Sequence, residues 1–340
     1  MRGIRYRAAR WLAPAVAIVT TTAVWAPSAA EQSAVPARLA SQSLLLGGAR
    51  AGQRLVAVGE RGHILLSSDS GASWQQAAAP TRATLTAVAF ADDQRGCAVG
   101  HGETIIRTQD GGVSWELVHA PPEREWPLLT VLFLDREHAI AAGAYGAFLE
   151  TRDGGATWQS RRISDDDLHL NHATRAASGH LYLAAEAGAL YRSDDGGTRW
   201  QSLPSPYEGS FYGALPLGGE SLLVYGLRGR LFRSDDAGNS WERLDTGTEG
   251  LLGHGIVLAD GTVALGGLGG ATLVSGDRGR SFRRVPVEDR RGTSALLETP
   301  RGDLLSLGEG GIRALSLAAG TEAETGAATP GGAGGDGGRM

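Results

Sequence analysis

The sequence predicts an all-β fold, a seven-bladed β-propeller made of four-stranded antiparallel blades with Asp-box turns. Three observations predict it: an acidic turn motif that recurs about every 41 residues, a glycine-rich turn that occurs seven times, and the composition. The 340 residues include 51 Gly and 13 Pro, and only 6% are aromatic. Glycine is costly inside helices, so this composition favours short strands joined by tight turns. Four short strands in roughly 40–45 residues are typical of a propeller blade.

The two ends of the chain are expected to lie outside this fold. Residues 1–30 have the pattern of a signal peptide, because four arginines precede an apolar stretch and small residues allow cleavage near Ala30. The apolar stretch is short for a membrane span, and a retained anchor is the alternative. We therefore expect an exported, periplasmic protein with its propeller in residues 31–318. Residues 319–340 are rich in Gly and Ala and are expected to form a disordered tail.

One motif, Ser/Thr-x-Asp-x-Gly-x-x-Trp, occurs six times, with Phe in place of Trp in the last copy. Its aspartates, spaced 41, 43, 42, 41 and 41 residues apart, are Asp69, Asp110, Asp153, Asp195, Asp236 and Asp277. An aspartate can close a turn by accepting hydrogen bonds from backbone N–H groups two residues on, and glycine supplies the positive φ of the turn. The Trp is expected to start the returning strand and cover the base of the hairpin. Since the aspartates are spread around a ring, we expect them to be structural, not catalytic.

A second marker, a two-residue turn between glycine-rich corners, precedes each acidic motif and has a seventh copy. Its copies are Gly59–Gly62, Gly100–Glu103, Gly143–Gly146, Ala185–Gly188, Gly226–Gly229, Gly267–Gly270 and Gly308–Gly311. Apolar runs flank these turns, and further runs such as Leu85–Phe90 lie upstream, so each period contains four strands, A to D. Seven turns predict seven blades. The seventh blade lacks the acidic motif, so we expect residues 33–40 to supply its outer strand and close the ring.

Composition and charge exclude several classes of function. The formal net charge is −5, so no nucleic-acid-binding surface is predicted, and all 32 basic residues are Arg. The single cysteine, Cys97, rules out an intrachain disulfide or a cysteine metal cage and is expected to be buried. His169 and His172 stand three residues apart in a predicted strand, where they point to opposite faces and are poor metal ligands. We expect no metal and no small-molecule cofactor.

These repeats resemble the Asp-box, or BNR, repeat of bacterial propellers over roughly residues 44–317. The seven blades, the glycine turns and the export signal look most like the photosystem II assembly and stability factor family, in its broader bacterial membership. The resemblance implies a non-catalytic lumenal or periplasmic protein that binds a membrane-protein precursor during assembly. Membership does not require a photosystem, because many bacterial relatives lack one and would bind another envelope protein. We expect a monomer whose partner is a subunit of a membrane or envelope complex.

Strand order predicts which face binds the partner. In a four-stranded up-and-down blade, the B–C turns and the D-to-A linkers lie on one side, and the A–B turns and acidic turns on the other. The first side gathers the variable segments, and loops on a rigid scaffold often carry function. Exposed rings among arginines are typical of protein-contact surfaces, unless the rings pack on neighbouring blades and the charges are merely solvated. The candidate partner-binding residues are Arg61, His101, Trp126, Tyr145, Arg161, Arg162, Tyr207, Arg228, Arg290 and Arg291.

The alternative function is that of an exported glycoside hydrolase or a carbohydrate-binding propeller, since the Asp-box also occurs in sialidases and other hydrolases. A sialidase needs an arginine triad, and the Arg-Ile-Pro signature of that family is absent. Another glycosidase needs two carboxylates across a cleft, and Glu123, Glu125 and Asp165–Asp167 are candidates by location only. No Gly-x-Ser-x-Gly motif or nucleotide-binding fingerprint in a βαβ context occurs. We therefore assign no catalytic residue and expect a non-catalytic protein.

Overall fold

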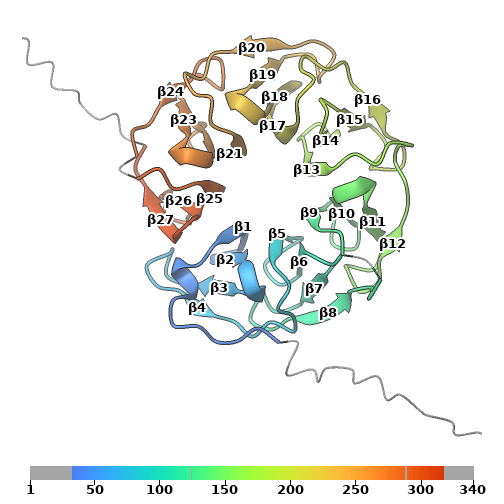
Figure 1. The fold of residues 1–340 in the computed structure, drawn as a ribbon, viewed down its shortest axis with the longest axis vertical. Coiled ribbons are helices and arrows are strands. Elements are labelled where there is room, and N and C mark those ends of the chain that lie inside the picture. Colours follow the sequence, from blue (N-terminus) through green and yellow to red (C-terminus); the bar gives the residue numbers. More distant parts are fainter. Residues whose placement is uncertain (1–32, 124, 288, 318–340) are drawn as a thin grey trace, which may run out of the picture.

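The computed structural model describes residues 33–317 except 124 and 288, and these residues form seven antiparallel sheets around a central axis (Figure 1). Blade one consists of β1 (Leu45–Ala51), β2 (Arg54–Gly59), β3 (Ile64–Ser67) and β4 (Gln75–Gln76). Blade two consists of β5 (Leu85–Phe90), β6 (Gly96–Gly100), β7 (Ile105–Thr108) and β8 (Glu116–His119). Blade three consists of β9 (Leu128–Phe133), β10 (Ala139–Gly143), β11 (Phe148–Thr151) and β12 (Gln159–Ser160).

The other four blades and the short 3-10 helices complete the described fold. Blade four consists of β13 (Leu170–Arg175), β14 (Leu181–Ala185), β15 (Leu190–Ser193) and β16 (Gln201–Ser202), and blade five of β17 (Phe211–Gly218), β18 (Ser221–Gly226), β19 (Leu231–Ser234) and β20 (Glu242–Leu244). Blade six consists of β21 (Leu252–Val257), β22 (Val263–Gly267), β23 (Thr272–Ser275) and β24 (Arg283–Arg284). Blade seven consists of β25 (Thr293–Glu298), β26 (Leu304–Gly308) and β27 (Gly311–Leu315). The helices are η1 (Ala40–Gln42), η2 (Glu60–Gly62), η3 (Ala144–Gly146), η4 (Leu227–Gly229) and η5 (Leu268–Gly270).

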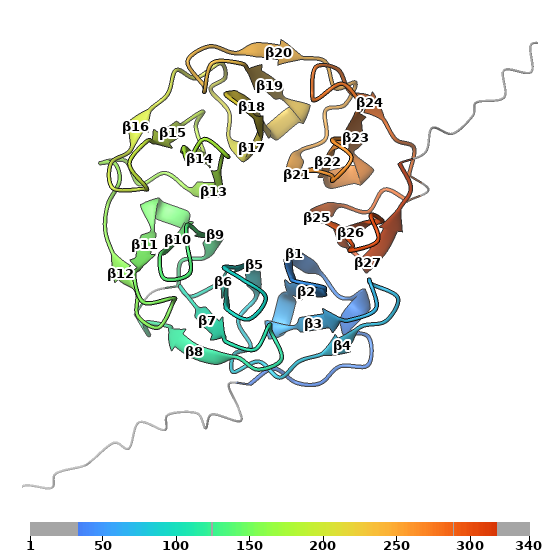
Figure 2. The same ribbon diagram turned by 180° about the vertical axis from the view of Figure 1, so that it is seen from behind.

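Within each blade the strands follow chain order from the axis to the rim. The innermost strands are β1, β5, β9, β13, β17, β21 and β25, and the view from behind shows the same ring (Figure 2). The predicted seven-bladed all-β fold is therefore confirmed. In the part of the chain that is described, no helix has the length and apolar character needed to cross a bilayer.

The hydrophobic core is divided into seven clusters, and most of them join two neighbouring blades. One cluster, for example, packs Cys97 and Val99 of blade two against Val131 and Ala141 of blade three. The second strands of the blades, such as β6 and β10, are buried along their whole length because another blade covers each face. Cys97 is fully buried, as expected, and burial raises the pKa of its thiol to about 12. Its small side chain serves packing between blades.

The six acidic motifs each close the hairpin between the third and fourth strands of a blade. In blade one, the Ser67 hydroxyl donates to Asp69 Oδ1 (2.8 Å), and the N–H of Gly71 donates to the Ser67 hydroxyl (2.8 Å). The N–H of Ser73 donates to Asp69 Oδ1 (2.9 Å) and its hydroxyl to Oδ2 (2.6 Å). The other five copies repeat this pattern, except that in blade four the Arg199 guanidinium replaces the second hydroxyl. We call these hairpins the aspartate turns.

The predicted bonding of the aspartate is wrong in one respect. Asp69 binds the N–H four residues on, not two, because the Ser67 hydroxyl already accepts the N–H of Gly71. The predicted positive φ is confirmed, at 87° for Gly71. The tryptophan precedes the outer strand and packs between its own blade and the preceding one, where Trp115 lies edge-on to Phe90 with ring centroids 6.3 Å apart.

The expectation that residues 33–40 form the outer strand of blade seven is wrong. The N–H of Ala34 donates to the Ala79 carbonyl (3.0 Å), and the Gln76 side chain binds the backbone of the same segment. The segment therefore lies along the outer edge of blade one. Pro36 has no N–H and interrupts any strand ladder that this segment could form.

Apolar packing closes the ring. Leu45 and Leu55 of blade one share a buried cluster with Leu297 and Leu307 of blade seven, and all four are at most 5% exposed. In the described residues, β27 pairs with β26 alone, so blade seven has three strands. Closure thus relies on side chains of the inner strands, without a strand shared between the two ends.

The aspartate turns predict a dependence of stability on acid pH. The Thr157 hydroxyl, and further hydrogen bonds, lower the pKa of Asp153 to about 2. A carboxylate whose folded pKa lies below its unfolded value of about 3.9 stabilises the fold above that value, and the contribution is lost as pH falls toward the folded pKa. We expect Asp153→Asn to lower the free energy of unfolding by about 1 kcal/mol at pH 7, after allowance for solvent screening, and this gap to shrink between pH 4 and pH 2.

Urea unfolding followed by tryptophan fluorescence at several pH values measures this gap. Asp166→Asn is the control, because the Asp166 side chain makes no such bonds, and it should leave stability unchanged. A gap for Asp153→Asn that stays constant down to pH 2 would contradict the role given to the aspartate turns.

Candidate protein-binding face

The B–C turns and the D-to-A linkers lie on one face, as strand order predicts. The N–H of the first turn residue donates a hydrogen bond to a linker carbonyl. For example, the N–H of Ala144 donates to the Pro127 carbonyl (2.9 Å), and the N–H of Leu227 donates to the Ser210 carbonyl (3.1 Å). On the other face, the aspartate turns bind the A–B turns, as where Gly111 donates to the Gln94 carbonyl (2.8 Å). We call the two sides the linker face and the aspartate face.

The glycine turns fix the linkers by close backbone contact. Gly62 has a φ of 72°, and a Cβ atom there would stand 2.1 Å from the Thr81 carbonyl of the next linker. At Gly59, a Cβ atom would stand 2.1 Å from the Leu44 carbonyl. Only glycine allows the turn to pack this closely against two linkers. The loops of the linker face are therefore held on a rigid frame.

Three of the turns carry large side chains at a position that favours glycine. Arg61, Tyr145 and Arg228 have φ values of 56°, 54° and 56°, whereas the equivalent residue in three other turns is glycine. A left-handed conformation costs a non-glycine residue roughly 1–2 kcal/mol. Strain of this kind clusters at functional positions, and these side chains all lie on the linker face.

Three rings form a shelf on the linker face of blades three and four. The centroid of Tyr145 lies 5.4 Å from that of Trp126 and 4.9 Å from that of His169. Tyr145 is 51% exposed and Trp126 is 39% exposed, so the shelf presents aromatic surface to solvent. We call these three residues the aromatic shelf.

The backbone of the shelf is held in place from several directions. The N–H of Glu103 donates to the Trp126 carbonyl (2.8 Å), and the N–H of Gly146 donates to the Leu168 carbonyl (2.9 Å). Glu103 is itself buried, with its carboxylate 3.5 Å from His119 Nε2. A surface ordered in advance loses less conformational entropy when a partner binds.

A cavity of about 430 Å³ lies at the axis. The first halves of all seven innermost strands line it, together with His101 of the second B–C turn. Tyr212 of β17 lines the cavity and is 36% exposed. The cavity therefore opens on the linker face, and a partner that covers the shelf can also reach it.

Two histidines in the cavity bridge neighbouring blades. The Nδ1 atom of His172 accepts the N–H of Ala214 (3.4 Å), and Nδ1 of His254 accepts that of Leu296 (3.2 Å). Burial lowers the pKa of His172 to about 4, and burial together with the charge of His172 lowers that of His254 to about 3. Both rings are therefore neutral near pH 7, with the proton on Nε2.

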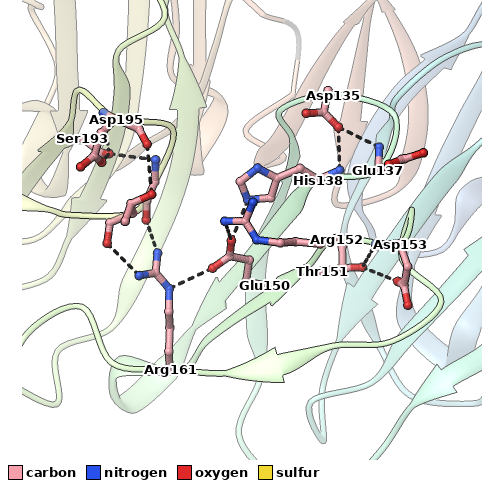
Figure 3. A network of polar contacts seen from close by, with 12 residues as sticks. Asp135, Glu137, His138, Glu150, Thr151, Arg152, Asp153, Arg161, Ser193 and Asp195 are labelled. Atoms are coloured by element: carbon pink, nitrogen blue, oxygen red, sulfur yellow. Dashed lines mark hydrogen bonds and ion pairs between the residues drawn. The ribbon is translucent and has the colours of Figure 1, made fainter.

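Arg161 is placed differently from the prediction, because its guanidinium is engaged by neighbouring groups of blades three and four. Its Nε atom lies 3.1 Å from Glu150, and its other nitrogens donate to the carbonyls of Gly197 and Thr198 in the next aspartate turn (Figure 3). The guanidinium also lies over the Phe148 ring, 5.0 Å from its centroid. The two terminal nitrogens hold blade three against blade four, and the Nε atom pairs within blade three.

Tyr207 is also placed differently from the prediction. Its ring packs against Phe211 and Phe232, with centroids 6.0 and 6.2 Å away, and contributes to the core between blades four and five. The alternative considered for the rings, packing on a neighbouring blade, therefore applies to Tyr207. Trp126 and Tyr145 contact each other and remain exposed.

The remaining candidate arginines are exposed on the linker face. Arg162 pairs with Asp167 (2.8 Å), and Arg291 lies 3.6 Å from Asp289. Arg228 lines a cavity of about 600 Å³ beside blade five. The other exposed members of the predicted set are Arg61, His101 and Arg290. The linker face therefore carries both exposed aromatic side chains and exposed arginines, a combination that suits a protein partner.

The sequence profile of the family described as photosynthesis system II assembly factor YCF48 matches residues 66–203 and 122–261. These segments together cover more than half of the chain. The chain belongs to this family. The family assignment agrees with the resemblance found in the repeats. No curated protein matches the sequence.

Solved structures of the family and of another propeller share the fold. The structure described as YCF48 bound to D1 peptide has a TM-score of 0.67 and 20% identity, over 82% of this chain and 97% of that chain. YCF48 from Cyanidioschyzon merolae has a TM-score of 0.66 and 18% identity, over 83% and 97%. The WD40 propeller domain of Doa1 has a TM-score of 0.65 with only 10% identity, over 82% and 94%. At these identities the likeness concerns the fold alone.

The sequence does not point to Tyr212, to His254 or to the contact of His169 with Tyr145. The inner-strand residues could have been found from their register, since the cavity is lined by residues at the second to fourth positions of the first strands. His169 was considered only as a metal ligand. The structure places its ring against Tyr145, whereas that of His172 lies in the cavity. Among the described residues, no group of three or more acidic, histidine or cysteine side chains could hold a metal.

The segment Asp165–Asp167, considered for a hydrolase, makes contacts within its own loop. Asp167 pairs with Arg162, and the backbone carbonyls of Asp165 and Asp166 accept hydrogen bonds from Arg162 and Ser164. These contacts fold the linker between blades three and four. They give no support for a catalytic pair.

The two cavity histidines predict a second dependence on pH. The unfolded chain binds protons at these residues below about pH 6.5, whereas the folded protein binds them only near pH 3–4, so stability is lost as pH falls through this window. We expect His254→Gln, whose amide oxygen can still accept the N–H of Leu296, to reduce the loss of stability between pH 6.5 and pH 4. Urea unfolding of both proteins tests this, and parallel curves would contradict it.

Proposed function

We propose that the protein is an exported, non-catalytic propeller that binds a subunit of a membrane or envelope complex and assists its assembly or stability. The observation that carries the proposal is the aromatic shelf of Trp126, Tyr145 and His169, which is exposed on the linker face. Membership of the YCF48 family supports it, as does the related structure described as YCF48 bound to D1 peptide. A photosystem II subunit is one candidate partner, and another envelope protein is the alternative in a host without a photosystem.

The shelf is suited to an extended segment of the partner. Trp and Tyr dominate protein-contact energies because they bury much surface with few rotatable bonds. The arginines around the rim, such as Arg61 and Arg228, add charge-assisted hydrogen bonds to carboxylates or carbonyl groups. The neutral axial cavity can accept a side chain from the partner. Because the frame is rigid, binding uses surface that is already ordered.

The protein is proposed to act as a monomer in the periplasm, after removal of a signal peptide near Ala30. Residues 1–32 lie outside the described structure, so this part of the proposal comes from the sequence pattern. The carboxylates of the aspartate turns and of Asp167 have structural partners, which supports a binding role in place of catalysis.

A photocrosslinking experiment tests the proposed face. Benzoylphenylalanine in place of Tyr145 should crosslink a specific envelope protein in native membranes, identified by mass spectrometry. Val113, on the aspartate face, is 52% exposed and makes a matched control, since Tyr145 is 51% exposed. We expect little or no crosslinking of that partner from position 113.

The substitution Tyr145→Ala should weaken capture of the same partner by about tenfold or more, because a buried aromatic anchor contributes roughly 1–2 kcal/mol or more. Val113→Ala should leave capture unchanged. Equal crosslinking from both faces, or unchanged capture by Tyr145→Ala, would overturn the proposal.

A further inference from the structure

Blade seven has an open outer edge where each of the other blades has a fourth strand. In the described residues, β27 pairs with β26 on its inner side and with no strand on its outer side (Figure 1). Unpaired strand edges carry rows of free N–H and C=O groups and readily accept another strand. The edge therefore needs an explanation.

The register identifies the backbone groups at this edge. In blade six, the outer strand pairs at Leu273 and Val274, and the Thr272 carbonyl accepts the N–H of Val285 (2.9 Å). The equivalent positions of β27 are Ile312, Arg313 and Ala314, because β27 pairs with β26 as β23 pairs with β22. Backbone groups of alternate residues point the same way, so Ile312 and Ala314 present their N–H and C=O outward. Ala314 is exposed.

The aromatic residue of the fourth strand is also missing. Six of the seven core clusters contain the Trp or Phe that follows an aspartate turn. The seventh, between blades six and seven, consists of aliphatic side chains, including Leu296, Leu304 and Leu315. Blade seven therefore lacks both the strand and the ring that the other blades supply.

A cavity of about 420 Å³ lies at this position. Arg313 to Ser316 line it on one side and Pro286 and Val287 on the other. Pro286 corresponds to Pro204, whose carbonyl accepts the indole N–H of Trp241 from the next blade (2.9 Å). The cavity thus occupies the place that an aromatic ring and a fourth strand take elsewhere.

The charges at the cavity favour an acidic ligand. Arg313 donates to Asp289 (2.5 Å), and Arg291 lies 3.6 Å from the same carboxylate. Among the described residues, two guanidinium groups therefore share this one carboxylate, and the three groups together carry one net positive charge. A carboxylate from a bound segment would balance it with charge-assisted hydrogen bonds.

We propose that the open edge of blade seven binds an extended segment of a partner protein by strand addition, with an aromatic side chain in the cavity and a carboxylate near Arg291 and Arg313. In this mode, backbone hydrogen bonds to Ile312 and Ala314 give affinity, and the side-chain pocket gives specificity. The site is separate from the aromatic shelf and does not rest on the function proposed there.

Other occupants fit less well. The 23 residues after Leu317 contain no aromatic residue and consist largely of Gly, Ala, Thr and Glu, which are poor replacements for the missing strand. Antiparallel pairing of β27 with a second copy would bring Arg313 of one chain near Arg313 of the other, and like charges across strands are destabilising. An acidic, aromatic segment from another protein meets neither difficulty.

A peptide taken from the chain itself serves as the probe. The segment of residues 113–120, VSWELVHA, contains the fourth strand of blade two with its Trp and a Glu. A synthetic fluorescein-labelled copy is titrated with the full chain, and fluorescence anisotropy measures binding. We expect saturable binding, weakened about tenfold or more when Trp115→Ala is introduced into the peptide.

The variant Ala314→Pro removes the outward N–H of the edge. Proline is tolerated at a strand edge whose N–H faces solvent, so the thermal midpoint should stay close to that of the Ala314→Ser control. Binding of the peptide should fall about tenfold or more in Ala314→Pro and remain unchanged in Ala314→Ser. Tyr145→Ala should not affect it, which separates this site from the linker face.

Four outcomes would overturn the proposal. They are absence of saturable binding, equal binding by Ala314→Pro and Ala314→Ser, much tighter binding by a chain that ends at Leu317, and a concentration-dependent dimer in sedimentation that Ala314→Pro abolishes. The third would identify the chain's own C-terminal residues as the occupant, and the fourth would identify a second copy.

Discussion

The hydrogen bonds that an aspartate accepts from the residue four positions on hold the two outer strands of each complete blade together. These outer strands contain only two to four residues, too few to be stable through their own ladder. The aspartate turn stabilises the hairpin between these strands. In it, the Ser or Thr hydroxyl donates a hydrogen bond to the Asp carboxylate and accepts one from the Gly N–H, and the carboxylate also accepts the N–H four residues on. It also sets the tryptophan between two blades, so local turn chemistry determines the packing of the ring.

Because the aspartate turns fix the blades, the residues of the linker face are free to vary. Glycine turns press against the linkers, and at three of them a large side chain takes the left-handed position that glycine would occupy more easily. The result is an ordered surface of rings and arginines around a neutral cavity. Blade seven departs from the repeat, since it has neither an aspartate turn nor an outer strand in the described residues. Closure by the leucines of the inner strands makes this departure possible.

The sequence was sufficient to predict the blade number, the strand order and the two faces, because two motifs repeat the same geometry, the acidic motif six times and the glycine turn seven times. The sequence was insufficient to predict the contacts of a side chain that can reach groups on more than one blade. Arg161 was predicted on the linker face but binds the neighbouring aspartate turn, and Tyr207 packs in the core, since side-chain direction depends on the next blade. The N-terminal segment was assigned to the outer strand of blade seven on topological grounds, but residues 34–37 form their hydrogen bonds with blade one.

Hydrogen exchange at the six backbone amides bound by the aspartates tests the central claim most directly. These N–H groups belong to Ser73, Ser114, Thr157, Arg199, Ser240 and Ser281. They lie in exposed turns, and exposed amides without partners exchange rapidly. The account predicts that all six exchange slowly at neutral pH, as observed by NMR. Exchange at the rate of an unstructured peptide, while the inner strands stay protected, would contradict it.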